Sequence, residues 1–419
     1  RPLRRRGRPP RTRAPVIALH LLVTFVGVAL GVFYPFISVI LAARGFSPSE
    51  IGLVFSIGAV GFTLAVPAWG HLADVRLGRP RTLQIGAVGA GAAVAGLLLP
   101  SPALVVGALL LLFWIFESSW QPLADAITVN ALRGRDYARV RLFMSLGFAG
   151  AAIASGYVYD VLGYDPAMVF LVAAAAMIAV SAAFVPDAER ADLDAHRRRA
   201  TRGTGATGHL PSSRRWPGLG SAGVALRVAP RLGAVLVATV LLYVGIISGF
   251  TFLPLRIEAL GGTPSDVALS AGLSGAAEVP GMLVMGVVVK RLGLRAIFAI
   301  AALVYGACMA SWMVLEVPGV IVATRVLTGL AFAGVIVSAV LTIARLLPRD
   351  LQGTGQALLQ TSAFGVGAVI ANMLGGLLYE SFGHAALFGV GALLAVVAAA
   401  IGWLGFPRRD APQVRRSST

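Results

Sequence analysis

Ionisable side chains that lie inside long apolar segments are the residues of this sequence best placed to do chemistry. Glu117, Asp125, Glu278 and Arg325 fall inside such segments, and Arg141 lies at the edge of one. An ionised side chain at the centre of a membrane helix costs about 2.5 to 3.5 kcal/mol on insertion scales. Burial disfavours the charged form of a carboxyl group, so the group can bind a proton and release it when its surroundings change. These residues therefore predict proton binding in a polar pathway.

Polar side chains also recur every four residues along three of the apolar segments. Residues at this spacing share one face of a helix. We expect these faces to line a central aqueous cavity. The three stripes are Glu117, Gln121 and Asp125; Ser270, Ser274 and Glu278; and Gln352, Gln356 and Gln360.

Each candidate residue has a functional and a structural interpretation. We expect Glu278 or Asp125 to carry the proton, with Glu117 as a further candidate, and Arg141 to pair with Asp125 or to bind a substrate anion. The alternative is that these carboxylates form ion pairs that only hold helices together, and that Arg325 pairs with one across the bundle. The predicted substrate contacts are Arg141, Asp125, Gln121, Arg325, Ser274, Gln360, Tyr34 and Tyr243.

The composition excludes an ordinary water-soluble fold. Of the 419 residues, 57% are hydrophobic even before the 50 glycines are counted, and only 13% are charged. Soluble domains are about 45 to 50% apolar with glycine included, and about 25% charged. A membrane helix needs about 20 apolar residues, so the chain is long enough for twelve spans. We expect an all-α integral membrane protein.

Apolar runs between charge clusters divide the chain into two six-helix halves, residues 15–185 and 231–406. A basic tail (1–14), a mostly disordered linker (186–230) and a C-terminal tail (407–419) complete the predicted organisation. The twelve predicted spans are residues 15–43, 50–73, 82–99, 102–131, 142–162, 166–185, 231–256, 266–289, 294–315, 318–346, 354–379 and 384–406.

The positions of the basic residues predict the orientation in the membrane. Of the 35 arginines and lysines, the gaps on one side of the predicted bundle hold only Arg44 and Arg256, and Arg325 lies within a span. The rest flank the spans on the side of the tails and the linker. Basic residues concentrate on the cytoplasmic side of membrane proteins. We therefore expect a multi-pass protein of the cell membrane with both termini cytoplasmic, whose net charge of +17 reflects topology and not nucleic-acid binding.

The two halves resemble each other in sequence. At a constant offset of 220, a set of glycines, a tyrosine and an acidic residue recur in the second half. Two six-helix repeats in parallel orientation, with a site between them, are typical of secondary transporters. The matched residues are Gly147, Gly156, Tyr159, Asp160 and Gly163 with Gly367, Gly376, Tyr379, Glu380 and Gly383.

The loop after the second predicted span resembles the signature of the major facilitator superfamily. Its residues are Gly70, Asp74, Arg76, Gly78, Arg79 and Arg81, with one additional residue, Val75, between the aspartate and the arginine. The resemblance implies that this loop helps to hold the inward-facing gate shut, through charge pairs that break when the halves rock. The resemblance to the superfamily as a whole covers nearly the entire chain apart from the tails and linker.

Within that superfamily, the sequence resembles the branch that contains lactose permease, phenylpropionate permease and nucleoside proton symporters. The strings RDYARVRLFMSLGF (residues 135–148) and LPRDLQGTGQALLQ (residues 347–360) carry this resemblance. It implies that an acidic residue late in the fourth helix and an arginine early in the fifth contact substrate, the positions of Asp125 and Arg141. The sugar permeases of the branch use a histidine and glutamate pair on the tenth helix, where this chain has Thr328 and aliphatic residues near Arg325.

We therefore predict a secondary transporter that moves a small organic solute by alternating access, with the proton as coupling ion and with no other cofactor. The alternatives are a proton-antiport exporter of the same fold and a non-transporting membrane sensor or scaffold. The chain has no GxxxxGK[ST] phosphate loop, its histidines are scattered, and it shows no nucleophile and base arrangement. We accordingly expect no ATP, metal or nucleic-acid partner and no enzymatic activity; the expected partners are the solute, protons and the lipid bilayer.

Overall fold

The computed structural model describes residues 13–132, 137–185 and 219–407, and every regular element in these ranges is a helix. The first half contains α1 Arg13–Phe33, η1 Tyr34–Phe36, α2 Ile37–Ala43, α3 Pro48–Leu72, η2 Ala73–Leu77, α4 Arg79–Gly96, α5 Ala103–Glu117, α6 Trp120–Leu132, α7 Tyr137–Leu162 and α8 Pro166–Ala183. The remainder contains α10 Leu219–Val228, α11 Arg231–Ala259, α12 Pro264–Leu292, α13 Leu294–Val314, α14 Pro318–Leu346, α15 Arg349–Gln360, η3 Thr361–Val366 and α16 Gly367–Gly405.

The helices agree with the predicted all-α membrane fold. Ten helical segments of the described chain are long and apolar enough to cross a membrane. One of them, Arg349–Gly405, comprises two passes, because Gly383 has a positive φ of 80° that interrupts the helix. α4 is not among the ten, since its glycines and its two arginines lower its hydropathy, but it packs against α5 and α8. With these two features, the described helices are consistent with the predicted twelve passes.

The last part of the predicted linker is helical, which corrects the expectation of a disordered segment there. α10 occupies residues 219–228, and Ala225 belongs to a small apolar cluster with residues of α14 and α15 that includes Ile343 and Leu359. Ala225 is fully buried in this cluster, whereas Val224, Leu226 and Val228 of α10 are exposed. Packing at Ala225 stabilises a short helix that would be marginal alone. Residues 186–218 of the predicted linker lie outside the described residues.

Several spans are interrupted near their middle. η1 separates α1 from α2 at Tyr34, and a break at Ser118 and Ser119 separates α5 from α6. The π-helical turn η3 separates α15 from α16. In a membrane, non-helical backbone is tolerated where it is buried in protein or lines a cavity. These interruptions accordingly mark the interior of the bundle.

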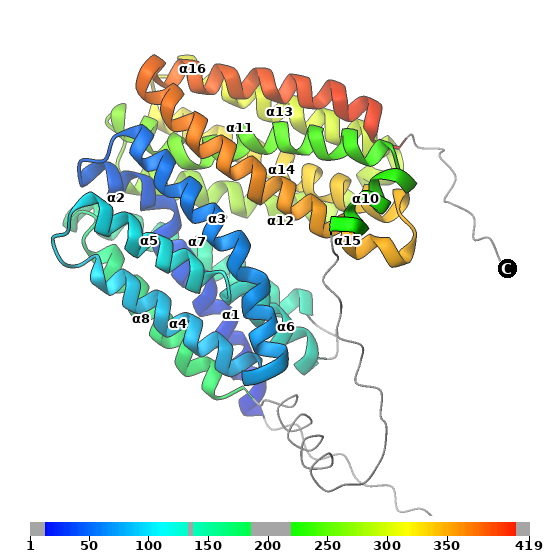
Figure 1. The fold of residues 1–419 in the computed structure, drawn as a ribbon. Coiled ribbons are helices and arrows are strands. Elements are labelled where there is room, and N and C mark those ends of the chain that lie inside the picture. The colour runs from blue at the N-terminus through cyan, green and yellow to red at the C-terminus, as the bar shows by residue number, and fades with distance from the viewer. Residues whose placement is uncertain (1–12, 133–136, 186–218, 408–419) are drawn as a thin grey trace, which may run out of the picture.

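The two halves meet at one end of the molecule and diverge towards the other (Figure 1). They diverge towards the end where α1 begins and α16 finishes, near α6 and α15. We call this the termini end and the opposite one the far end. At the far end, Gly156 and Gly376 allow close backbone approach between the halves. A Cβ on Gly156 would lie 2.5 Å from the Cβ of Ala268, and one on Gly376 would lie 2.5 Å from the carbonyl oxygen of Pro48.

Two carboxylates, one from each half, tie the halves together at the far end. Asp160 Oδ1 of α7 accepts a hydrogen bond from the backbone N–H of Ser265, at 2.8 Å, and Glu380 Oε2 of α16 accepts one from Ser49, also at 2.8 Å. Both donors lie in the first turn of a helix, where the N–H groups lack intrahelical partners and the helix dipole favours negative charge. We call these contacts the far-end clamps. They join α7 to α12 and α16 to α3.

The clamps follow the internal repeat that the sequence shows. Asp160 and Glu380 are a matched pair at the offset of 220, as are Gly156 and Gly376. The two receiving helices begin alike, since Ser47 and Thr263 each form a capping box with the acidic residue three positions later. The repeated residues therefore build the same contact twice around the pseudo-twofold axis.

Neutralising both clamps is expected to open the far end more often. In the double variant Asp160→Asn with Glu380→Gln, both helix N-termini lose their charge interaction with a carboxylate, so the far-end equilibrium shifts towards the open state. The measurement is the labelling rate of Ala271→Cys, which lines the cavity, by an impermeant maleimide added on the far side. The native Cys308 is replaced by alanine throughout.

A matched control neutralises Asp165, which precedes α8 at the same end and makes no side-chain capping hydrogen bond there. Asp165→Asn should leave the labelling rate unchanged. An unchanged rate in the double clamp variant would contradict the assignment of these carboxylates as the far-end lock.

Candidate functional site

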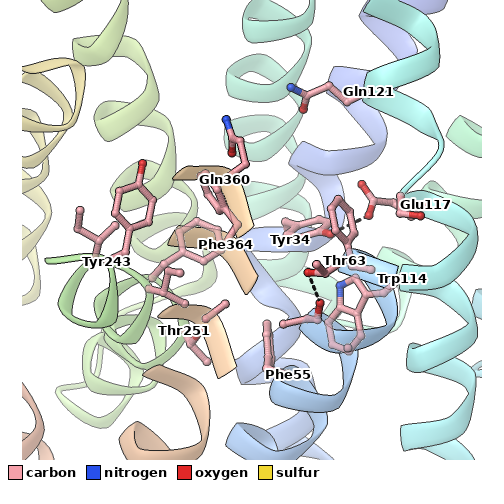
Figure 2. Close-up of a pocket in the computed structure, with 18 of the residues that line it drawn as sticks. Tyr34, Phe55, Thr63, Trp114, Glu117, Gln121, Tyr243, Thr251, Gln360 and Phe364 are labelled. Atoms are coloured by element: carbon pink, nitrogen blue, oxygen red, sulfur yellow. Dashed lines mark hydrogen bonds between the residues drawn. The ribbon is translucent and has the colours of Figure 1, made fainter. Parts of the chain in front are cut away.

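A large cavity of about 910 Å³ lies between the two halves. Elements of both halves contribute to its wall, and Figure 2 shows Tyr243, Thr251 and Phe364 facing Tyr34 and Glu117 across it. The far-end clamps close one end of the molecule, whereas the halves separate towards the termini end (Figure 1). The geometry is that of a central site accessible from one side.

The cavity gathers nearly all of the predicted site residues. The wall includes Tyr34, Glu117, Gln121, Asp125, Tyr243, Ser274, Glu278, Arg325 and Gln360. The polar stripe predicted on the fourth span therefore faces the same space as Ser274 and Glu278 of the eighth, whereas Ser270 lines a small adjoining pocket. Of the glutamine stripe, Gln360 lines the cavity, whereas Gln352 and Gln356 donate hydrogen bonds to backbone carbonyls at the end of α14. Of the three glutamines predicted to line the cavity, only Gln360 does so.

Glu117 is the last residue of α5, at the break before α6, and only 5% of its surface is exposed. The Tyr34 hydroxyl donates a hydrogen bond of 3.0 Å to Glu117 Oε2. Tyr34 stands at the interruption of the first span, so two broken helices of one half bring the phenol and the carboxyl group together (Figure 2). The pair places a titratable oxygen on the cavity wall.

Asp125, Arg141 and Glu278 form a charged cluster that spans the two halves. Arg141 Nε lies 3.7 Å from Asp125 Oδ1, which confirms the predicted contact between α6 and α7. Glu278 of α12 is close enough for the charge of Arg141 to act on it. Arg141 is not part of the cavity wall itself, but the guanidinium lies behind it and also contacts the sulfur of Met144. The charge of one arginine thus acts on a carboxylate of each half.

Arg325 lies elsewhere on the wall, on α14. Its Nε donates to the carbonyl oxygen of Ser270 at 3.3 Å, and its Nη1 donates to Thr328 Oγ1 at 3.1 Å. The expectation that Arg325 pairs with a carboxylate across the bundle finds no support among the described residues, where its contacts are with neutral groups.

Part of the cavity wall consists of residues that the sequence did not single out. Thr251 Oγ1 donates to Asn372 Oδ1 at 2.7 Å, and both residues line the cavity, as does Phe364. Asn372 is a polar residue in an apolar run, a signal that the sequence does contain. Phe364 lies in the π-helical turn η3, and such turns, frequent at functional sites, have no reliable sequence signature. The aromatic wall residues are Tyr34, Phe55, Phe62, Trp114, Phe148, Tyr243, Phe250, Tyr305, Phe332 and Phe364.

The predicted gating loop lies at the termini end, away from the cavity. Asp74 pairs with Arg79 of the same loop at 3.3 Å, and its side chain is 60% exposed. Gly70 precedes the loop at the end of α3, Arg76 is exposed, and Gly78 adopts a positive φ of 79° before α4. The halves are apart at this end (Figure 1), and the Asp74–Arg79 pair lies within the first half.

The additional residue of the loop has a structural explanation. Residues Ala73–Leu77 form a π-helical turn, in which the N–H of Gly78 bonds to the carbonyl of Ala73 at 3.0 Å. A π turn contains one residue more than an α turn. The turn therefore absorbs Val75 and keeps Asp74 within reach of Arg79. In the second half, Gly293 repeats the conformation of Gly78 with a φ of 79°.

Comparisons with known proteins agree with this architecture. The maltose permease of Geobacillus stearothermophilus is 27% identical over 372 residues, which cover 86% of this chain and 86% of that protein. Among solved structures, a D323A mutant of the nucleoside transporter NupG superposes with a TM-score of 0.78 at 15% identity, covering 93% of this chain and 99% of the other. A D-xylose-proton symporter superposes with a TM-score of 0.70 at 14% identity, covering 94% and 99%.

A family model described as the MFS_1 like family matches residues 16–390, which include both halves and every residue of the cavity wall. The match extends from the first span to the last one. The chain therefore belongs to the MFS_1-like family, and it is a multi-pass secondary transporter of the major facilitator type and not an enzyme.

Proposed function

We propose that this chain is a proton-coupled symporter that imports a small organic solute across the cell membrane, with both termini in the cytoplasm. In this orientation the far end faces outwards, and the structure is an inward-facing state with the outer gate closed by the far-end clamps. The distribution of arginines supports the orientation. The similarity to a maltose permease supports solute uptake, and the similarity to a D-xylose-proton symporter supports coupling to protons.

The observation that carries the proposal is that Arg141 pairs with Asp125 of its own half while its charge also acts on Glu278 of the other half. Arg141 and Asp125 belong to one half and Glu278 to the other, so rocking of the halves changes the distance from Arg141 to Glu278 but not to Asp125. A carboxylate that loses a cationic neighbour in a low-dielectric site binds a proton more readily. Glu278 is therefore the group whose protonation changes with the conformation of the protein.

Such a cluster couples proton and solute movement through population shifts. In the outward-facing state, a proton and a solute bind; in the inward-facing state, Arg141 approaches Glu278 and favours the ionised carboxylate, which releases the proton to the cytoplasm. A ligand shifts an equilibrium only by its differential affinity for the two states. The approach of Arg141 to Glu278 supplies that difference for the proton.

Neutralising Glu278 is expected to uncouple transport. Glu278→Gln keeps the size of the side chain but cannot take part in the proton cycle, so uptake driven by a proton gradient should fall to background. Exchange of solute across proteoliposomes without net proton movement should persist. The control is Glu316→Gln, an exposed carboxylate in the loop between α13 and α14. Gradient-driven uptake by Glu278→Gln at the rate of the control would remove Glu278 from the coupling mechanism.

The direction of proton flux tests the proposed function as a whole. The experiment uses proteoliposomes with a pH dye and adds sugars, organic acids, nucleosides and cationic drugs in turn, without an imposed gradient. A symporter takes up protons with its solute, so the outside medium should become more alkaline. Acidification would show the antiport exporter instead. Silence of the entire panel would overturn symport and favour a non-transporting protein.

A further inference from the structure

We propose that Arg325 binds an anionic group of the transported solute, and that the solute is an organic carboxylate. This inference rests on the transport function proposed above and names the chemical class of its substrate. Arg325 borders the large cavity and also a small adjoining pocket lined by Ser270, Ala271 and Phe250. The guanidinium therefore stands at the boundary between the space that a solute occupies and the closed far end.

The charge of Arg325 has no carboxylate partner within the described part of the chain. Only 5% of the residue is exposed. The ion pairs within 4.0 Å among the described residues join Arg79 to Asp74 and Arg141 to Asp125. An arginine stays protonated in proteins, and a buried charge without a counter-ion is costly. A solute carrying one negative charge offsets that cost when it binds.

The guanidinium is held in place by neutral groups. Ser270 and Thr328 accept from Nε and Nη1, and the ring of Trp312 lies 5.8 Å from the guanidinium carbon. Trp312 is itself fixed, because its indole N–H donates to Thr324 Oγ1 at 2.8 Å. Among the described contacts, the hydrogen bonds of Arg325 use Nε and Nη1. Nη2 is left to donate to a ligand. The guanidinium group is already ordered before the ligand binds, which lowers the entropy cost of binding.

The arrangement of charge along the cavity gives the solute an orientation. Ser270, which contacts Arg325, and Glu278 lie on the same helix, and at 1.5 Å per residue they are separated by about 12 Å along its axis. The positive charge of Arg325 therefore lies towards the far end, whereas the Asp125, Arg141 and Glu278 cluster lies towards the termini end. A solute with its carboxylate on Arg325 extends its remaining part towards this cluster.

The remainder of the wall suits an apolar or aromatic body with a few polar groups. Phe250, Tyr305 and Phe332 line the part of the cavity contributed by the same half as Arg325, and Trp114 and Phe55 face them from the other half. Aromatic faces contribute large apolar contact areas and tolerate stacked rings. A single guanidinium matches the single charge of a carboxylate, whereas a phosphate monoester carries close to two charges. The site thus favours a monocarboxylate.

The test measures ligand-induced thermal stabilisation of the full chain in lipid nanodiscs with matched pairs: benzoate and benzamide, 3-phenylpropanoate and its amide, and glucuronate and glucose. We expect at least one carboxylate to raise the unfolding temperature where its neutral partner does not. Removing a hydrogen-bonded charge pair costs about 1.5 to 3 kcal/mol. Arg325→Gln should therefore weaken the binding of that carboxylate by about 10- to 100-fold and leave the binding of neutral compounds unchanged. Arg325→Lys should retain the preference with lower affinity.

Arg44 provides the matched control, because its Nη2 donates to the carbonyl oxygen of Leu97 at 2.7 Å outside the cavity. Arg44→Gln should bind the carboxylate like the unmodified chain. If Arg325→Gln fails to fold, the proposal is tested by Arg325→Lys and by whether the unmodified chain prefers each carboxylate over its neutral partner. Equal stabilisation by both members of every pair, stabilisation by none, or a preference that survives Arg325→Gln would overturn the proposal. Proton-coupled uptake of a neutral solute would overturn the inference of a carboxylate substrate and leave the symport proposal standing. Carboxylate binding without proton flux would overturn the symport proposal and leave the inference of a carboxylate substrate standing.

Discussion

The close contact of the two halves at the far end is the constraint on which the rest of the structure depends. The N–H groups of Ser49 and Ser265 are held by the carboxylates Glu380 and Asp160, one on each side of the pseudo-twofold axis. Small residues next to the clamps let the backbones touch. Because each half is internally rigid, closure at one end forces separation at the other. The cavity and its single opening follow from this lever geometry.

The contents of the cavity depend on where the helices are interrupted. A continuous helix satisfies its backbone internally. The interruptions at η1, after α5 and at η3 each bring a side chain to the cavity wall, namely Tyr34, Glu117 and Phe364. The interruption at Tyr34 meets the one at Glu117, and their hydrogen bond joins two separate spans. The polar groups of the site are therefore positioned by departures from helical regularity and by the rigid helices around them.

The two arginines of the site stand in different electrostatic situations. Arg141 pairs with Asp125 and its charge acts on Glu278 of the other half, so its effect on Glu278 depends on the distance between the halves, which the transport cycle changes. Arg325 is fixed within one half by Ser270 and Thr328, and its surroundings change little when the halves rock. The first arrangement suits a coupling ion that must be bound and released. The second suits recognition of a fixed feature of the solute.

Much of this protein is determined by its sequence alone, because the membrane allows few solutions. Long apolar segments in lipid must be helical, and so the twelve passes, the two halves and the polar faces of Gln121 and Ser274 follow from composition and spacing. The internal repeat likewise identifies Asp160 and Glu380, although not their partners. Helix content at Leu219–Val228 was not evident, because burial against α14 and α15 stabilises it and its own propensity does not. The tertiary structure alone decided three further features. They are the carboxylate that Arg141 contacts, the lack of a carboxylate partner for Arg325 among the described residues, and the end at which the cavity is closed. These depend on distances between segments far apart in the chain, and the periodicity of one helix carries no information about them.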